Sequence, residues 1–367
     1  MVFVCVVVVP SWPLPLGDGQ APSWAGRGTK AAGTYDCGVA PSLALSVLDL
    51  AMVRDGASSS DALHETASVA QAADRLGYTR FWVAEHHNTT TVASTSPPVL
   101  MAHLAAVTEH IRVGSGGVML PNHSPLAVAE QFAMLEALYP GRVDLGIGRA
   151  PGTDRNTAVA LRGARASESE DAFPRNVLHV MSMLGDHRAE HEPPTHLVAT
   201  PNATTSPAVM LLGSSDFSAR LAGMLGLPFG FAHHFQMGGT VQAAQIYHDA
   251  FSPSPLLAEP HLIVTATTVV GDSDEHAEFL SAPSRLTRLG LRTGRLLPLL
   301  PPAEAVEHPL FGQASTMSSN GLVGTAETLA AGMVEVAGAT GADEIMIYPV
   351  AHGIADRIAC LQALSPS

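Results

Sequence analysis

Residues 80–88 of this chain read Arg-Phe-Trp-Val-Ala-Glu-His-His-Asn. An apolar run of strand-forming residues, 81–84, ends abruptly in one acid and two histidines. In parallel sheets and barrels, functional side chains lie where the strands end on their carboxyl side. The stretch therefore predicts a buried parallel strand whose C-terminal end lies in an active site. The alternative interpretation is a pair of structural histidines that are hydrogen-bonded at a strand end.

The same strand pattern recurs along the chain at intervals. Strand-like runs begin at residues 80, 111 and 142, an equal spacing of 31 residues that matches one strand–helix unit. Helical patterns lie before and between these runs, and the first of them stops at Gly77. Further strands are predicted to begin at residues 43, 208, 229, 262 and 344. Eight strands that alternate with helices favour an α/β fold, a (β/α)8 TIM barrel with insertions in its βα loops.

Composition limits the class of protein. The chain has 367 residues, of which 46% are hydrophobic and 14% are charged, and this mixture suits an enzyme with buried parallel strands. A formal net charge of −14 and the lack of basic clusters disfavour a nucleic-acid-binding protein. The three cysteines are far apart, which argues against a disulfide framework and favours a cytoplasmic location. The apolar run Val2–Val9 is too short to span a bilayer, so we expect no membrane association.

Two segments stand out from the barrel pattern. Residues 1–42 are rich in Gly, Pro, Ser and Ala after the first few positions, and we expect a disordered N-terminal extension there. Residues 43–367 are predicted to form a single barrel domain. Within it, Leu280–Asn320 is rich in Leu, Pro and Ser, and a stretch of this length predicts a lid or a mobile loop.

A metal site is one possible use of the strand-end histidines. Glu85, His86, His233 and His234 all lie at predicted strand ends and carry metal-ligating atoms. Zinc hydrolases with a barrel fold usually have a His-x-His pair on the first strand, whereas the first strand here ends near Asp49. We therefore predict no metal and keep the metal hydrolase as an alternative.

An anion site is the second possibility. Ser214 and Ser215 directly precede a predicted helix, so their hydroxyls and the first free amides of that helix could bind a phosphate. Ser218 lies one turn into the helix, and Arg149 leaves the fourth strand with a positive charge. The structural alternative is ordinary helix capping by Ser215.

Two adjacent glycines interrupt the third strand. Gly116 and Gly117 would let a flat cofactor ring approach the backbone closely, or would permit an unusual peptide geometry. The alternative explanation is a simple β-bulge.

Several stretches, taken in order, resemble one known family. They are Ala-Glu-His-His at 84–87, Val-Gly-Ser-Gly-Gly-Val-Met-Leu-Pro-Asn-His-Ser-Pro at 113–125, Gly-Arg-Val-Asp-Leu-Gly-Ile-Gly-Arg-Ala-Pro-Gly-Thr-Asp at 141–154, Leu-Gly-Ser-Ser at 212–215, Leu-Gly-Leu-Pro at 225–228 and Gly-Ala-Asp-Glu at 341–344. With this order and spacing, the sequence resembles the bacterial luciferase-like monooxygenases, which are flavin-dependent (β/α)8 barrels.

The resemblance implies roles for individual residues. His86 matches the histidine that acts as the acid/base group beside the flavin. Gly116-Gly117 match a non-prolyl cis peptide that supports the isoalloxazine ring. Positions that contact the flavin phosphate and its surroundings match Arg149, Ser215 and Ser218. Luciferase itself has a reactive cysteine where this chain has Gly148 and an acid where it has Ser214, so light emission from a long-chain aldehyde is not implied.

The resemblance also implies a reaction. Reduced FMN from a separate flavin reductase would react with oxygen to give a flavin peroxide, which oxygenates a small organic substrate while His86 transfers protons. One alternative is a deazaflavin-dependent hydride-transfer enzyme of the same superfamily, and another is a flavin-binding protein without turnover. The chain could also assemble as a homodimer.

Overall fold

The computed structural model describes residues 43–163, 170–186, 197–235, 238–293, 297–317, 319 and 321–366. The predicted disordered extension, residues 1–42, lies outside the described residues.

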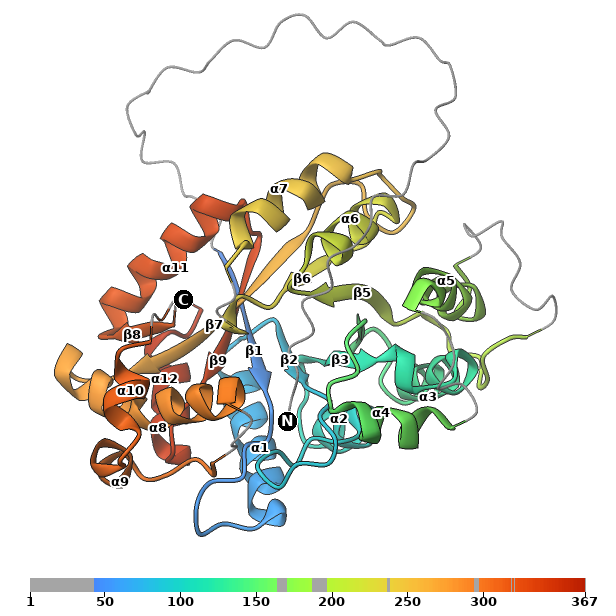
Figure 1. Ribbon diagram of the computed structural model, residues 1–367. Helices are drawn as coiled ribbons and strands as arrows, with labels where there is room; N and C mark the ends of the chain where they lie inside the picture. Colours follow the sequence, from blue (N-terminus) through green and yellow to red (C-terminus); the bar gives the residue numbers. More distant parts are fainter. Residues whose placement is uncertain are drawn as a thin grey trace, which may run out of the picture. The chain divides into compact units, whose positions relative to one another are not determined.

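Eight parallel strands close into a barrel with helices around it (Figure 1). The barrel strands are β1 (Ala44–Asp49), β2 (Arg80–Val83), β3 (Arg112–Met119), β4 (Val143–Gly148), β5 (Ala208–Gly213), β6 (Phe229–Phe231), β7 (Leu262–Val270) and β9 (Glu344–Pro349). Neighbours follow chain order from β1 to β7, and β9 closes the ring between β7 and β1. Each strand begins within one residue of its predicted start, so the (β/α)8 prediction is confirmed.

The helices surround the strands and fill the longer insertions. They are α1 (Ser59–Arg75), α2 (Pro97–Ala106), α3 (Pro125–Leu138), α4 (Arg155–Arg162), α5 (Phe173–Met183), α6 (Asp216–Met224), α7 (Thr240–Ala250), α8 (Asp274–Thr293), α9 (Pro302–Glu307), α10 (Phe311–Ser315), α11 (Ala326–Thr340) and α12 (Ile354–Ala363). Within the described ranges, none of these helices is both long enough and apolar enough to cross a membrane.

The insertion between β7 and β9 differs from the prediction. Leu280–Asn320 was expected to be a lid or mobile loop, but it contains the second half of α8 together with α9 and α10. Pro283 lies inside α8 and helps to hide the helical pattern. Side chains of the three helices form a small core of their own, which includes Leu286, Ala305 and Ala314. A ninth strand, β8 (Leu322–Gly324), follows and pairs only with β7 among the described strands.

The alternation of β2 shows how the sequence builds the barrel wall. Phe81 and Val83 point outward into the large core between strands and helices, whereas Trp82 packs inside the barrel with Leu48 and Met346. Successive residues of a strand point to opposite faces, so the apolar run at 81–83 supplies both cores at once. Both faces are buried because this parallel strand is covered by helices on one side and by the barrel interior on the other.

A buried ionic network lies at the N-terminal end of the barrel interior. Arg80 donates to Glu344 Oε1 at 2.9 Å and to Asp144 Oδ2 at 2.8 Å, and the Trp82 indole donates to Asp144 Oδ2 at 3.0 Å. Arg112 adds a hydrogen bond of 2.6 Å to Asp144 Oδ1. The paired charges close this end of the barrel, which leaves the C-terminal end for ligands.

Candidate active site

The predicted site residues come from four neighbouring strands. His86 follows β2, the glycine pair lies within β3, Arg149 follows β4, and the serines 214, 215 and 218 follow β5. These strands pair in that order, so their C-terminal ends lie side by side along one part of the barrel mouth. The structure therefore brings the predicted residues to one side of the mouth.

His86 is held by hydrogen bonds on both its backbone and its ring. Its N–H donates to the Ser94 carbonyl at 3.0 Å, and its Nδ1 lies 3.2 Å from the Gly152 carbonyl oxygen. A carbonyl only accepts, so this contact places the ring proton on Nδ1 and leaves Nε2 with a free lone pair. Burial lowers the pKa of His86, although the Gly152 hydrogen bond and the Glu85 charge oppose this effect. The imidazole is therefore neutral near pH 7 and can accept a proton at Nε2.

Glu85 is a fully buried carboxylate that joins the loops after β2 and β3. Its Oε1 lies 2.8 Å from His87 Nε2 and 2.7 Å from His123 Nε2, and its Oε2 accepts from the Met119 N–H at 3.0 Å. Burial alone would raise the pKa of Glu85, but the hydrogen bonds, foremost that of His123, lower it below its usual 4.5. Glu85 is therefore ionised at neutral pH, and its hydrogen bonds hold the His87 and His123 side chains and the end of β3 together next to His86.

The residues that could bind a metal ion in the structure differ in part from those predicted from the sequence. Among the described residues, the group that could hold an ion is Glu85, His87 and His123, whose ligand atoms lie within 4.8 Å of one another. His86 and His233 use ring nitrogens elsewhere, His233 Nδ1 lying 2.6 Å from the Thr240 hydroxyl. Both Nε2 atoms of the group face one carboxylate oxygen, so hydrogen bonds alone account for its geometry.

The glycine pair on β3 has the predicted unusual geometry. The Gly116-Gly117 peptide is cis, and the pairing with β4 shifts register between Gly116 and Val118, so the strand also bulges there. A Cβ on Gly116 would lie 2.8 Å from Leu48 Cδ1, and one on Gly117 would lie 2.6 Å from Leu212 Cδ1. A Cβ on Gly117 would also lie 2.7 Å from the Gly146 carbonyl oxygen, so the backbone of β4 excludes a side chain at Gly117 whatever the ligand, whereas at Gly116 the end of the Leu48 side chain would have to shift.

The start of α6 has the composition expected of a phosphate site. Ser215 occupies the N-cap, but its side chain makes no cap hydrogen bond, so the alternative of ordinary capping is wrong. Ser218 is buried, and a Cβ on Gly213 would lie 2.5 Å from its hydroxyl oxygen, so only glycine leaves room for this serine beside the strand end. The Arg149 guanidinium carbon lies 4.6 Å from the centre of the Phe217 ring.

The sequence analysis missed that His234 is buried in the mouth of the barrel with an unpaired ring nitrogen. His234 was considered only as a metal ligand, yet its Nδ1 is buried without a hydrogen-bond partner among the described residues. Burial, helped by the nearby His86 ring, lowers its pKa to about 3. Its ring also meets Tyr348 edge-on at 5.9 Å. A buried acceptor without a partner in a barrel mouth is a contact point for a ligand N–H or O–H group.

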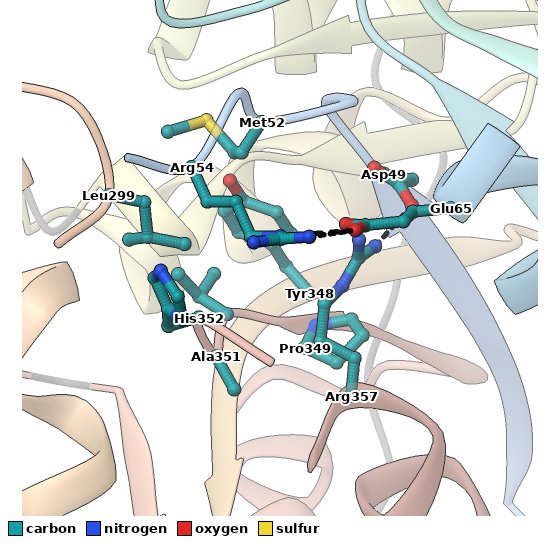
Figure 2. A pocket seen from close by; sticks show the side chains of 11 residues that line it. Asp49, Met52, Arg54, Glu65, Leu299, Tyr348, Pro349, Ala351, His352 and Arg357 are labelled. Atoms are coloured by element: carbon teal, nitrogen blue, oxygen red, sulfur yellow. Dashed lines mark hydrogen bonds and ion pairs between the residues drawn. The ribbon is translucent and has the colours of Figure 1, made fainter. Parts of the chain in front are cut away.

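A small pocket lies beside these residues, at the ends of β1 and β9 (Figure 2). Asp49, predicted as a strand-end residue, pairs here with Arg357 of α12 and accepts the Ala51 N–H at 2.6 Å. Arg54 in turn pairs with Glu65 of α1 at 3.0 Å. Both ion pairs in Figure 2 thus join helices to the barrel rim, and Asp49 has a structural role.

Comparisons with known proteins agree with this geometry. The sequence model of the luciferase-like monooxygenase family matches residues 44–344. A luciferase-like monooxygenase of Escherichia coli is 41% identical over 310 residues, which cover 83% of this chain and 91% of that protein. The N-acetyl-S-alkylcysteine monooxygenase of Bacillus subtilis is 36% identical over 252 residues, 68% of this chain and 75% of that protein.

A solved structure shares the fold at lower identity. The oxygenating constituent of 3,6-diketocamphane monooxygenase from Pseudomonas putida, in complex with FMN, superposes with a TM-score of 0.67 and 18% identity. The superposition covers 89% of this chain and 97% of that one. The chain belongs to the luciferase-like monooxygenase family of oxidoreductases.

Proposed function

We propose that this protein is a monooxygenase that uses reduced FMN and molecular oxygen to oxygenate a small organic molecule. The observation that carries the proposal is the arrangement along one side of the mouth, where a neutral His86 and a serine- and arginine-bearing helix start follow neighbouring strands. FMN in the diketocamphane monooxygenase and the sulfur-containing substrate named for the Bacillus subtilis relative support it as analogies.

The residues at the start of α6 fit the phosphate of FMN. Ser214, Ser215 and Ser218 supply hydroxyl groups, the first turn of α6 supplies free N–H groups, and Arg149 supplies a positive charge. Hydroxyls, amides and a guanidinium are the donors that phosphate monoesters require. Reduced FMN, when bound, would supply the electrons that activate oxygen.

His86 would handle the proton that the reaction requires. Its Nδ1–H is held by the Gly152 carbonyl, so Nε2 can take up a proton and return it without a change of ring orientation. Glu85 holds the adjoining backbone through His87 and Met119, which keeps the imidazole in one place. Its lowered pKa makes His86 a base rather than an acid in the free enzyme at neutral pH.

The electrons would come from a separate flavin reductase. The sequence contains no G-x-G-x-x-G fingerprint after a strand, the usual signature of a nicotinamide site. We therefore propose that reduced FMN is taken up as a ligand from solution in the cytoplasm and leaves after oxidation.

The test begins with binding and continues with oxygen transfer. The purified protein is titrated anaerobically with reduced FMN and with a reduced deazaflavin coenzyme, and tighter binding of FMN is expected. The reduced FMN complex is then mixed with 18O-labelled oxygen and an N-acetyl-S-alkylcysteine or a cyclic ketone, and the products are analysed by mass spectrometry. Incorporation of one labelled atom supports the proposal. Binding of the deazaflavin alone, or oxygen consumption without labelled product from any substrate tried, contradicts it.

A further inference from the structure

We infer that His234 selects the substrate, because its Nδ1 accepts a hydrogen bond from an N–H or O–H group of the bound molecule. The inference rests on the proposed function and narrows its substrate class to small organic molecules that carry such a donor. His234 would touch the substrate without taking part in proton transfer, so its effect would appear in the discrimination between substrates and not in the binding of FMN.

His234 lies on a different wall of the mouth from the predicted flavin-site residues. It belongs to the short helix η4 (His233–Phe235), which follows β6 and packs against β7, whereas the flavin-site residues lie on or after β2, β3, β4 and β5. Its ring contacts Tyr348 of β9, with 5.9 Å between the ring centres. A charge on His86 would act on the His234 ring and lower its pKa, so both imidazoles lie in one mouth. A substrate that reaches His86 from the side of β6 and β9 would therefore meet His234.

The ring of His234 is held in one orientation. Phe235 packs against it with 4.4 Å between the ring centres and a tilt of 46°, and Tyr348 meets it at 71°. The Thr265 carbonyl of β7 accepts a hydrogen bond from the ring, a contact that opposes the lowering of its pKa. Because Nδ1 has no hydrogen-bond partner among the described residues, the donor is Nε2. A neutral imidazole carries one N–H group, so these contacts assign the lone pair to Nδ1.

The unpaired Nδ1 makes the mouth selective for donors. Burial lowers the pKa of His234 to about 3, so the ring stays neutral near pH 7 and Nδ1 remains an acceptor. A buried acceptor without a partner has lost its hydrogen bond to water and has gained nothing in return. A substrate with an N–H or O–H group restores that bond, whereas a substrate with an oxygen acceptor at the same place leaves it unmade and adds repulsion between lone pairs.

His248 on α7 provides an internal comparison. Its Nε2 is likewise buried without a hydrogen-bond partner among the described residues. A Cβ on Gly341, just before β9, would lie 3.2 Å from this nitrogen, which places His248 toward the N-terminal end of the barrel and away from the mouth. The two imidazoles share the same unpaired state, but only His234 lies where a substrate can bind. His248→Leu is therefore the matched control for His234→Leu.

The experiment compares two probes that differ only in the donor. One is an N-acetyl-S-alkylcysteine, and the other is its ester analogue, in which an oxygen atom replaces the amide N–H group. The kcat/KM for incorporation of 18O is measured for each probe with reduced FMN. One buried hydrogen bond corresponds to a preference of about 10- to 100-fold for the amide in the wild type. We expect His234→Leu to reduce this preference to within about threefold, and His234→Asn to retain part of it, because the amide oxygen of asparagine can take the place of Nδ1.

Further measurements make the test specific. His248→Leu should keep the wild-type preference, and His234→Leu should bind reduced FMN within about twofold of the wild type in anaerobic calorimetry. An unchanged preference in His234→Leu would overturn the inference, and so would weaker FMN binding in that variant, because the flavin would then be the donor. Oxygenation by the wild type of a cyclic ketone, which has no donor, but not of the amide probe would also overturn it. If the wild type incorporates label into none of these probes, the proposed function itself fails.

Discussion

Removal of the Glu85 carboxylate is the sharpest test of how the mouth is organised. In Glu85→Ala, the Met119 N–H and the Nε2–H groups of His87 and His123 lose their common acceptor. A hydrogen bond to a charged group contributes about 1.5–3 kcal/mol, and a buried donor left without a partner costs about 1–3 kcal/mol. Both imidazoles are partly exposed and can turn to water, so we expect a destabilisation of about 2–4 kcal/mol in total.

The isosteric variant and a surface control separate the network from simple loss of volume. In Glu85→Gln, the amide oxygen can accept from Met119, and the NH2 group can donate to both imidazoles once their protons move to Nδ1. We therefore expect Glu85→Gln to lose less than half as much stability as Glu85→Ala. Glu109 forms an exposed Glu–His pair with His110, and Glu109→Ala should stay within about 0.5 kcal/mol of the wild type.

Urea denaturation at several pH values provides the measurement. The folded-state pKa of Glu85 is lowered, so the stabilisation is present above its usual value of 4.5 and is lost as the pH falls through the folded-state pKa. The difference in unfolding free energy between wild type and Glu85→Gln should therefore be constant near pH 7 and shrink in acid. A Glu85→Ala variant as stable as Glu109→Ala, or a difference that grows on acidification, would refute the reasoning.

Three further outcomes follow from the same contacts. His86→Ala should keep FMN binding within about twofold but lower turnover by ~10²–10⁴, as measured by stopped-flow kinetics, because only proton transfer is removed. Since the pKa of His234 is about 3, its ring signals in NMR should not shift between pH 5 and pH 8. Asp144→Asn weakens the buried bridge to Arg80 and should cost ~3 kcal/mol in denaturant unfolding, whereas a loss below ~1 kcal/mol would contradict the role assigned to the network.

The barrel could be predicted from the sequence because its signals are local. Apolar runs of four to nine residues, Gly77 and the prolines at 97 and 125 fix where strands and helices start and end. The Leu280–Asn320 insertion escaped prediction because Pro283 lies inside α8, where local rules place a helix end. Its helices are stabilised by packing against one another, and contacts of this kind leave no periodic mark on one short segment.

The site could be predicted only in part, for a similar reason. His86, the cis peptide and the α6 start follow from strand ends and from family resemblance. The partners that set their chemistry lie far apart in sequence: His123 is 38 residues from Glu85, and Gly152 is 66 from His86. His123 lies in the quoted Pro-Asn-His-Ser-Pro stretch, but its type alone does not reveal its acceptor. Nor could the sequence show that the backbone of β4 already excludes a side chain at Gly117.

The contacts divide the site into two halves that can fail separately. Glu85 ties the loops after β2 and β3 together around His86, whereas Arg149 and Phe217 connect the loops after β4 and β5. Interactions made equally in the ground and transition states change affinity, and those made only in the transition state change turnover. Changes at Ser218 should therefore appear in the dissociation constant of FMN and changes at His86 in turnover, so a Ser218 variant that binds FMN normally but turns over slowly would show that the halves are coupled.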